Sequence, residues 1–314
     1  MVENLKSQIT ELKNKKNAII LAHYYVADEI QDIADFVGDS LELSRKASLT
    51  EADIIVFAGV HFMAETAKIL SPQKKVLIPD IKSGCPLADS MGTSEFAKFK
   101  EKYPDYFVIN YVNSTAEIKA MSDLICTSSN AVELVKSLPS GTKILFGPDK
   151  NLGSFVKSFV KNEIILWNGN CPVHENFSAN KLQDLKNANP DAIVLAHPEA
   201  NKAVLLKSDI IGSTSKLLKY AIESENKKFI IATEPGIIHK MKQNDPNKEY
   251  IPLPPVQNLA ESICFNMKKH TLQKVYDALK YEQFEILMDE DLIKKAKVPI
   301  TRMIDLSVKL GLVK

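Results

Sequence analysis

One pattern of apolar and polar positions occurs three times along the chain. Each copy has a short apolar run that predicts a strand, then two polar residues spaced two apart, then a second short strand ending in Ser or Thr. The first residues of the three polar pairs stand 88 and then 86 residues apart. The copies are Asn17 to Leu21 with His23 and Tyr25, Phe107 to Asn110 with Tyr111 and Asn113, and Ala192 to Leu195 with His197 and Glu199.

The remainder of each copy is equally regular. Ser40, Ser128 and Thr214 stand 17 residues after the first member of each pair, and an aspartate precedes each of them by five residues. Strands that alternate with helices at short loop lengths favour parallel sheets in α/β units. The expected helices and the strands behind them are Leu41 to Ala47 with Ile54 to Ala58, Ala131 to Leu138 with Lys143 to Phe146, and Lys216 to Ile222 with Phe229 to Ala232.

The sequence therefore predicts an α/β fold of three similar small three-layer αβα domains, with parallel sheets, around a pseudo-threefold axis. The alternative is chance similarity among generic α/β units. We expect the repeats at residues 1–86, 87–172 and 173–265, followed by a C-terminal helical segment at 266–314. In that segment, apolar residues at helical spacing predict helices that pack back onto the first domain.

Composition and charge limit the functions that fit. A chain of 314 residues with 45% hydrophobic residues can bury a large core. It has 40 basic and 39 acidic residues and no basic stripe with interleaved aromatics, so no nucleic-acid partner is expected. The start, Met1 to Lys16, has the spacing of a surface helix, and no apolar run approaches the roughly 20 residues that span a bilayer. We expect a cytoplasmic protein without a membrane partner.

Three of the four cysteines fit the repeat. Cys85, Cys171 and Cys264 lie 62, 60 and 67 residues after the first polar residue of their own copy, whereas Cys126 takes a slot that Gly holds in the other copies. Cys126 is therefore expected to be a small buried residue. Three thiolates meeting on the axis, without close cysteine pairs, favour an iron-sulfur cluster with one open iron over zinc. Three unrelated core thiols are the alternative.

The polar residues predict an active site for an anionic substrate. Ligands of α/β units bind outside the carboxyl ends of the strands, where all three polar pairs would project, and His and Glu suit proton transfer there. Ser40, Ser128 and Thr214 lie at expected helix starts, which attract carboxylate or phosphate, although ordinary N-capping explains them too. His174 is either a group beside the metal centre or a polar loop residue. His61, His239 and His270 show no partner pattern in the sequence and are interpreted as incidental.

With these residues in view, the chain resembles the quinolinate synthase family over nearly its whole length. The resemblance rests on continuous runs rather than isolated residues. The matching runs are Ala22-His23-Tyr24-Tyr25, Gly38-Asp39-Ser40-Leu41, Phe62 to Ala67, Cys85 to Met91, Tyr111-Val112-Asn113, Gly147 to Gly153 and Ala196-His197-Pro198-Glu199. One segment departs from the family pattern: after Cys264 the chain reads Phe265-Asn266-Met267-Lys268, where the family often has other residues.

The resemblance implies three domains around a central 4Fe-4S cluster held by the three repeat cysteines. It implies a reaction that joins iminoaspartate to dihydroxyacetone phosphate with loss of phosphate and two waters, giving quinolinate for NAD synthesis. An enzyme that makes iminoaspartate would be a functional partner. The rivals are a cluster-dependent hydro-lyase acting on another small acid and a non-catalytic iron-sulfur or redox-sensing protein.

The resemblance also implies roles for single residues. Tyr25 and Glu199 would do acid/base work, and Tyr111 and Asn113 would orient the substrate. The catalytic set is Tyr25, Glu199, His197, His23 and Tyr111. The substrate-binding set is His23, Ser40, Tyr111, Asn113, Ser128, His197, Glu199 and Thr214.

Overall fold

The computed structural model describes residues 2–257 and 262–312, and this part of the chain forms three four-stranded parallel sheets. Every sheet has the same strand order, in which the first strand of the repeat lies between the second and third, and the fourth lies outside the third. The prediction of three similar αβα units with parallel sheets is confirmed. The strands are β1 (Ala18–His23), β2 (Phe36–Gly38), β3 (Ile54–Ala58) and β4 (Lys75–Leu77); β5 (Phe107–Tyr111), β6 (Leu124–Cys126), β7 (Ile144–Gly147) and β8 (Ile164–Leu166); β9 (Ile193–Ala196), β10 (Ile210–Ile211), β11 (Lys228–Ala232) and β12 (Glu249–Pro252).

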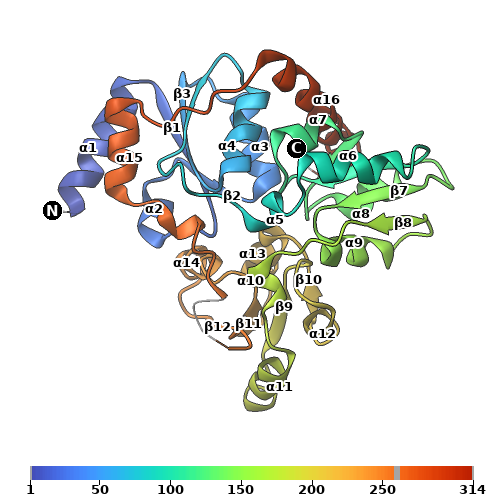
Figure 1. The fold of residues 1–314 in the computed structure, drawn as a ribbon. Helices are drawn as coiled ribbons and strands as arrows, with labels where there is room; N and C mark the ends of the chain where they lie inside the picture. The colour runs from blue at the N-terminus through green and yellow to red at the C-terminus, as the bar shows by residue number, and fades with distance from the viewer. Residues whose placement is uncertain (1, 258–261, 313–314) are drawn as a thin grey trace.

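Helices separate and cover these strands. The three sheets form three lobes around a common centre, coloured blue to cyan, green, and yellow to orange (Figure 1). In the first lobe α1 and α15 pack together against β1 and β3, while α3 and α4 pack together against β1 and β4. The helices are α1 (Val2–Lys15), α2 (Asp28–Ile33), α3 (Ser40–Leu49), α4 (His61–Leu70), α5 (Pro86–Asp89), α6 (Thr93–Glu101), α7 (Ala116–Ala120), α8 (Ala131–Lys136), α9 (Lys150–Lys157), α10 (Pro172–Glu175), α11 (Ala179–Ala188), α12 (Lys202–Leu205), α13 (Thr214–Glu223), α14 (Ile237–Asn244), η2 (Met267–Lys269), α15 (Leu272–Tyr281) and α16 (Glu290–Lys309).

The repeated aspartates join the first two strands of each sheet. Asp35, Asp123 and Asp209 accept the backbone N–H of Ile20, Val108 and Val194 at 2.8, 2.7 and 2.8 Å, respectively. Each aspartate also donates its own backbone N–H to the carbonyl oxygen of the same strand residue. Because an aspartate pairs both backbone groups of one strand residue, the spacing noted in the sequence has a structural cause.

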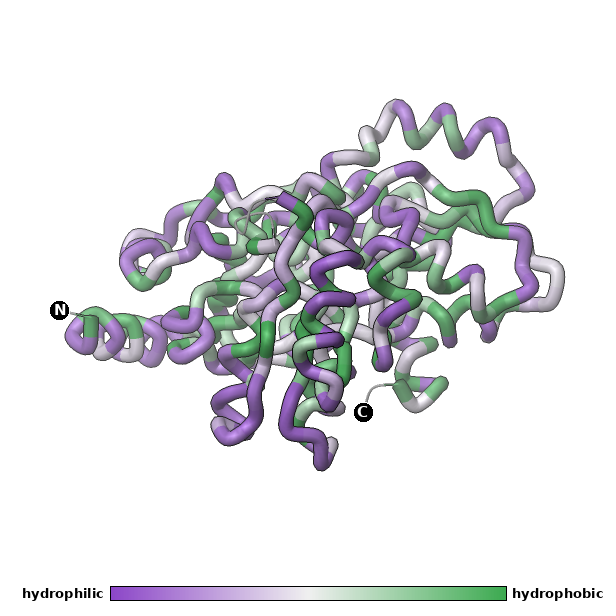
Figure 2. Tube along the Cα trace, turned by 90° about the horizontal axis from the view of Figure 1, so that it is seen from below, coloured by the Kyte–Doolittle hydropathy of each residue, from purple (hydrophilic) through white to green (hydrophobic). Residues whose placement is uncertain are grey.

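The strands are apolar because they are covered on both faces. All five residues of β3 and all four of β7 are buried, which is typical of parallel strands between helix layers. Apolar residues lie mainly inside the molecule, and hydrophilic ones along the outlying helices and loops (Figure 2). Cys126 in β6 is fully buried in this core, as expected for a small residue at its position.

The last two helices contact different parts of the molecule. Helix α15 packs against α1 and β3 of the first sheet. Helix α16 packs against α7 and β6, beside the second sheet, and also contacts α4. Among residues 2–257 and 262–312, no helix combines the length and apolar character that crossing a membrane requires.

Candidate active site

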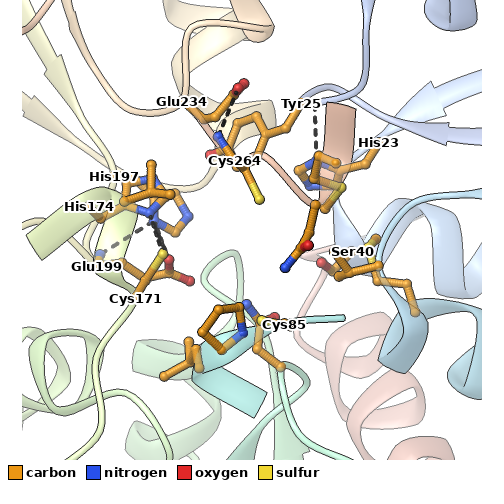
Figure 3. A pocket seen from close by; sticks show the side chains of 18 of the residues that line it. His23, Tyr25, Ser40, Cys85, Cys171, His174, His197, Glu199, Glu234 and Cys264 are labelled. Atoms are coloured by element: carbon orange, nitrogen blue, oxygen red, sulfur yellow. Dashed lines mark hydrogen bonds and ion pairs between the residues drawn. The ribbon is translucent and has the colours of Figure 1, made fainter. Parts of the chain in front are cut away.

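A buried pocket lies where the three lobes meet, at the carboxyl ends of their strands. The cavity measures about 270 Å³, and its walls come from all three repeats. Each of the twelve residues selected from the sequence lines it, and ten of the pocket residues are labelled in Figure 3. The twelve are His23, Tyr25, Ser40, Cys85, Tyr111, Asn113, Ser128, Cys171, His197, Glu199, Thr214 and Cys264.

The three repeat cysteines reach the pocket from three separate loops. Cys85 and Cys171 each stand directly before a short helix that begins with proline, and Cys264 stands three residues before η2. Their side chains point toward one space (Figure 3). All three are half-buried and form no disulfide. Burial raises the pKa of Cys85 to about 12 and that of Cys264 to about 11, so a bound metal centre would be needed to hold them as thiolates near pH 7.

The two strand-end histidines are neutral hydrogen-bond donors. His23 Nδ1 accepts the backbone N–H of Tyr25 at 3.2 Å, and His197 Nδ1 accepts that of Glu199 at 3.4 Å. Burial lowers the pKa of each histidine to about 3, so each ring carries its single proton on Nε2. His197 Nε2 donates to Ser128 Oγ at 3.1 Å. The repeat thus presents the same imidazole tautomer twice.

A chain of hydrogen bonds joins Tyr25 to Glu199. The Tyr25 hydroxyl lies 2.5 Å from Thr233 Oγ1, which lies 2.9 Å from His174 Nε2. On its other side His174 Nδ1 lies 2.9 Å from Glu199 Oε2 and 3.2 Å from Cys171 Sγ. Because a carboxylate only accepts, His174 donates from Nδ1 and accepts the Thr233 hydroxyl at Nε2. His174 therefore lies beside both a repeat cysteine and a predicted catalytic carboxylate.

Glu199 is a buried carboxylate surrounded by donors. Burial raises its pKa, but His197 and His174 nearby, together with hydrogen bonds from His174 and Tyr111, outweigh burial and bring the pKa to about 2. Burial also raises the pKa of Tyr25 and Tyr111 well above its usual value, so both phenols keep their protons. The pocket therefore holds an ionised carboxylate beside proton donors.

The helix-start hydroxyls do not cap their helices. Asp39 caps α3, Asn130 stands at the start of α8, and Ser213 caps α13. Ser40, Ser128 and Thr214 line the pocket instead. Asn113 adds a free acceptor, because its Oδ1 is buried and has no hydrogen-bond partner among the described residues.

Several groups in or beside the pocket were not selected from the sequence. Thr233 and Glu234 follow β11 directly, and Glu234 lines the pocket with an exposed fraction of 0%. Their position in the sequence could have located them. The third strand of each repeat runs parallel to the first, so the residues that directly follow it lie at the same edge of the sheet as the strand-end polar pairs. Asp39, Phe62 and Met63 also line the pocket.

The donors present could hold a metal in more than one way. Among the described residues, Cys171, His174 and Glu199 have ligand atoms that all lie within 4.8 Å of one another. Cys85 and Cys264 face the same pocket and add two more thiols. A centre of three thiolates would draw on all three repeats, whereas the Cys-His-Glu group combines Cys171 of the second repeat with His174 and Glu199 of the third.

Fold and pocket together define the class of protein. Three parallel α/β units surround one cavity in which an ionised carboxylate, protonated phenols, neutral imidazoles and three thiols face a common space. Such a concentration of buried titratable groups at the carboxyl ends of strands is typical of an enzyme active site.

Comparison with known proteins identifies the family. The family model described as quinolinate synthetase A protein matches residues 7–305. A quinolinate synthase of Microcystis aeruginosa is 53% identical over 305 residues, which cover 97% of this chain and 96% of the relative. Quinolinate synthases of Rippkaea orientalis and Synechocystis are each 53% identical over 304 residues, covering 97% of this chain and 94% and 96% of those relatives. The chain belongs to the quinolinate synthase family of enzymes.

One solved structure is similar over much of the chain. It is the E-1-hydroxy-2-methyl-but-2-enyl-4-diphosphate reductase from Plasmodium falciparum, which is 14% identical and covers 90% of this chain and 94% of its own. The TM-score of 0.31 is too low to define a shared fold.

Proposed function

We propose that this enzyme condenses iminoaspartate with dihydroxyacetone phosphate to give quinolinate, phosphate and two waters, a step of NAD biosynthesis. A 4Fe-4S cluster held by Cys85, Cys171 and Cys264 assists the reaction. The observation that carries the proposal is the convergence of three thiols, one from each repeat, on a cavity rich in groups that bind anions. Membership of the quinolinate synthase family supports it.

The donor set fits such a cluster. Soft thiolates are the usual ligands of iron-sulfur clusters, and three of them leave one iron without a protein ligand. When bound, a cluster with such an open iron acts as a Lewis acid toward a hydroxyl or carboxylate. His174, 3.2 Å from Cys171 Sγ, fits a group that orients a ligand through a hydrogen bond.

The anionic substrates would be bound by neutral donors. The Nε2–H groups of His23 and His197 and the hydroxyls of Ser40, Ser128 and Thr214 line the pocket on three sides. Hydrogen bonds from such donors to carboxylate or phosphate oxygens are strong because the acceptor is charged. The two histidines are therefore better suited to binding substrate than to removing a proton near pH 7, because their pKa values lie near 3.

Acid/base work falls to Tyr25 and Glu199. The condensation needs a base to remove a proton from carbon and an acid to assist loss of water. Glu199 is ionised and Tyr25 is protonated, and the hydrogen bonds through Thr233 and His174 connect them. To return a proton from Glu199 to Tyr25 after each turnover, His174 would first carry its proton on Nε2 and Thr233 would donate to Tyr25, which is the reverse of the arrangement described above.

Tyr111 and Asn113 would orient the substrate. The Tyr111 phenol acts on Glu199 and helps to lower the pKa of that carboxyl. The unpaired Oδ1 of Asn113 needs a donor, and an amino or hydroxyl group of a substrate would supply one.

Two rival functions remain distinguishable. A hydro-lyase acting on another small acid would need the thiols but not the ring of hydroxyls and imidazoles from three repeats. A redox sensor would need neither Glu199 nor Tyr25. The cytoplasmic location, an iminoaspartate-producing partner enzyme, and domain limits at residues 86, 172 and 265 belong to the same proposal.

The test is quinolinate formation by protein purified without oxygen and supplied with dihydroxyacetone phosphate and iminoaspartate generated in place. The wild type should release quinolinate and phosphate in equal amounts, and Cys171→Ala should form less than about 1% as much, because a three-ligand cluster loses its hold when one thiolate is removed. No quinolinate from protein with a full complement of iron and sulfide would rule out the assignment and favour the hydro-lyase.

A further inference from the structure

Buried carboxylates follow the third strand in two of the three repeats. Ala58, Gly147 and Ala232 are equivalent, because each pairs with the residue just before the first polar residue of its repeat. The second residue after these positions is Val60, Asp149 or Glu234. Asp149 and Glu234 both have an exposed fraction of 0%.

Asp149 connects the end of β7 to the loop of Cys171. Its Oδ1 accepts the backbone N–H of Leu152 at 2.7 Å and so caps α9. Its Oδ2 accepts the backbone N–H of Cys171 itself at 3.1 Å. One carboxylate thus holds a helix start with one oxygen and a repeat cysteine with the other.

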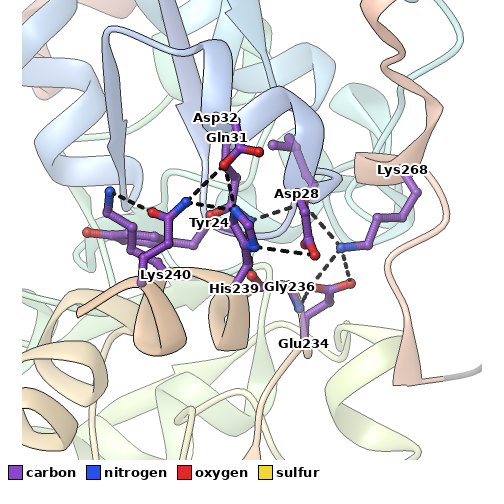
Figure 4. Close-up of polar contacts among 11 residues, drawn as sticks. Tyr24, Asp28, Gln31, Asp32, Glu234, Gly236, His239, Lys240 and Lys268 are labelled. Atoms are coloured by element: carbon purple, nitrogen blue, oxygen red, sulfur yellow. Dashed lines mark hydrogen bonds and ion pairs between the residues drawn. The ribbon is translucent and has the colours of Figure 1, made fainter. Parts of the chain in front are cut away.

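Glu234 has the same relation to Cys264. Its Oε1 accepts the backbone N–H of Cys264 at 3.3 Å and lies 3.1 Å from Lys268 Nζ. Its Oε2 accepts the backbone N–H of Gly236 at 2.7 Å. Figure 4 shows Glu234 held between Gly236 and Lys268. Both oxygens of the carboxylate are therefore held by Lys268 and Gly236, in addition to the hydrogen bond from Cys264.

From this repetition we propose that Asp149 and Glu234 are positioning residues of the three-cysteine centre, each fixing the backbone N–H of the cysteine in its own repeat. The inference rests on the proposed function, because it presumes that the thiols hold a cluster. Each cysteine stands in a loop, and a loop backbone held by a hydrogen bond to a rigid strand end presents its Sγ in a defined place. Groups that orient metal ligands in this way commonly change metal affinity 10- to 100-fold when substituted.

The first repeat anchors its cysteine segment differently. The Val60 side chain has no hydrogen-bond acceptor. In this repeat Ser83, two residues before Cys85, makes the contact between the end of the third strand and the cysteine segment instead. The Ser83 hydroxyl lies 3.0 Å from the Gly59 carbonyl oxygen, at the end of β3, and 2.9 Å from that of Asn266. In all three repeats the cysteine segment is tied to the end of the third strand.

The experiment compares cluster retention in substituted proteins. Asp149→Ser keeps one oxygen to cap α9 but cannot serve Cys171 as well, and Glu234→Gln keeps the shape but loses one acceptor oxygen. The matched controls make the same changes at carboxylates whose hydrogen bonds are to backbone N–H groups other than those of cysteines. Asp289→Ser alters the aspartate that caps α16, and Glu65→Gln alters a buried carboxylate whose Oε2 accepts the Ala116 N–H at 3.1 Å.

Iron and sulfide content, the rate of iron release to a chelator without oxygen, and the electron paramagnetic resonance spectrum of the reduced protein are measured for all five proteins. Asp149→Ser and Glu234→Gln should release iron about 10-fold faster than wild type or more, with altered spectra, while both controls match wild type. Release rates and spectra like those of wild type would overturn the inference, as would equal acceleration in the controls. A wild type that binds no iron would instead defeat the proposed function itself.

Discussion

Single residues in this molecule owe their chemistry to burial together with one or two specific partners. His23 and His197 are neutral because they are buried, and their tautomer follows from a backbone N–H two residues further along. That local contact follows from the strand-end spacing. His174 could not be assigned from sequence, because its partners Glu199 and Thr233 lie on other segments.

His270 predicts a pH dependence of stability. Its Nε2 lies 2.7 Å from the Gly59 carbonyl oxygen and therefore carries the proton, while Nδ1 is buried without a partner among the described residues. Burial lowers the pKa of His270 from 6.5 to about 4. A pKa lowered by folding contributes stability that is present above pH 6.5 and is lost as the pH falls toward 4.

Between pH 7 and pH 5 this single group should lower the free energy of unfolding by about 2 kcal/mol. His270→Gln keeps a donor for Gly59 but cannot be protonated. Between pH 7 and pH 5 the free energy of unfolding of this variant should therefore fall by about 2 kcal/mol less than that of the wild type. Urea unfolding of both proteins at the two pH values measures the difference. His239→Gln, which changes a half-buried histidine beside Asp28 and Asp32, is the comparison variant. Equal pH slopes for wild type and His270→Gln would contradict this account.

At the scale of elements, the periodicity of apolar residues predicted the longer helices and strands and missed the shortest strands. The expected strand Ile54 to Ala58 coincides with β3, and the expected helix Met1 to Lys16 corresponds to α1. The fourth strands β4 and β8 have three residues each, too few for an alternating or continuous apolar pattern to be recognised. The 20-residue helix α16 contains Pro299, a residue that usually ends a helix in sequence-based prediction.

The aspartates of the repeat predict a stability effect confined to one strand pair. Asp123→Ala leaves the backbone N–H of Val108 in β5 without its acceptor, which should lower the free energy of unfolding by about 1–3 kcal/mol. Urea unfolding followed by circular dichroism measures the change. The exposed Asp105 lies in the loop before β5, and Asp105→Ala should stay within about 0.5 kcal/mol of wild type. A loss for Asp105→Ala as large as that for Asp123→Ala would contradict the assigned role.

For the whole molecule, the threefold repeat explains both the fold and the pocket. Three copies of one strand order bring three sets of strand ends to one cavity, so residues some 86 to 88 positions apart become neighbours. The twelve residues that the repeat singled out therefore line one pocket. It could not predict Asp149 and Glu234, because their role depends on the path of loops that differ in length between the copies. It also could not predict which domain each C-terminal helix contacts, since α16 reaches across to the second sheet.

The central claim is that one cysteine from each repeat serves a single centre. Its most direct test is the iron and sulfide content of anaerobically prepared wild type and of four single Cys→Ala variants. We predict about four iron and four sulfide per chain in the wild type and in Cys126→Ala, whose thiol is buried in β6 away from the pocket. Cys85→Ala, Cys171→Ala and Cys264→Ala should each lose the cluster. Full clusters in any of these three, or loss in Cys126→Ala alone, would contradict the claim.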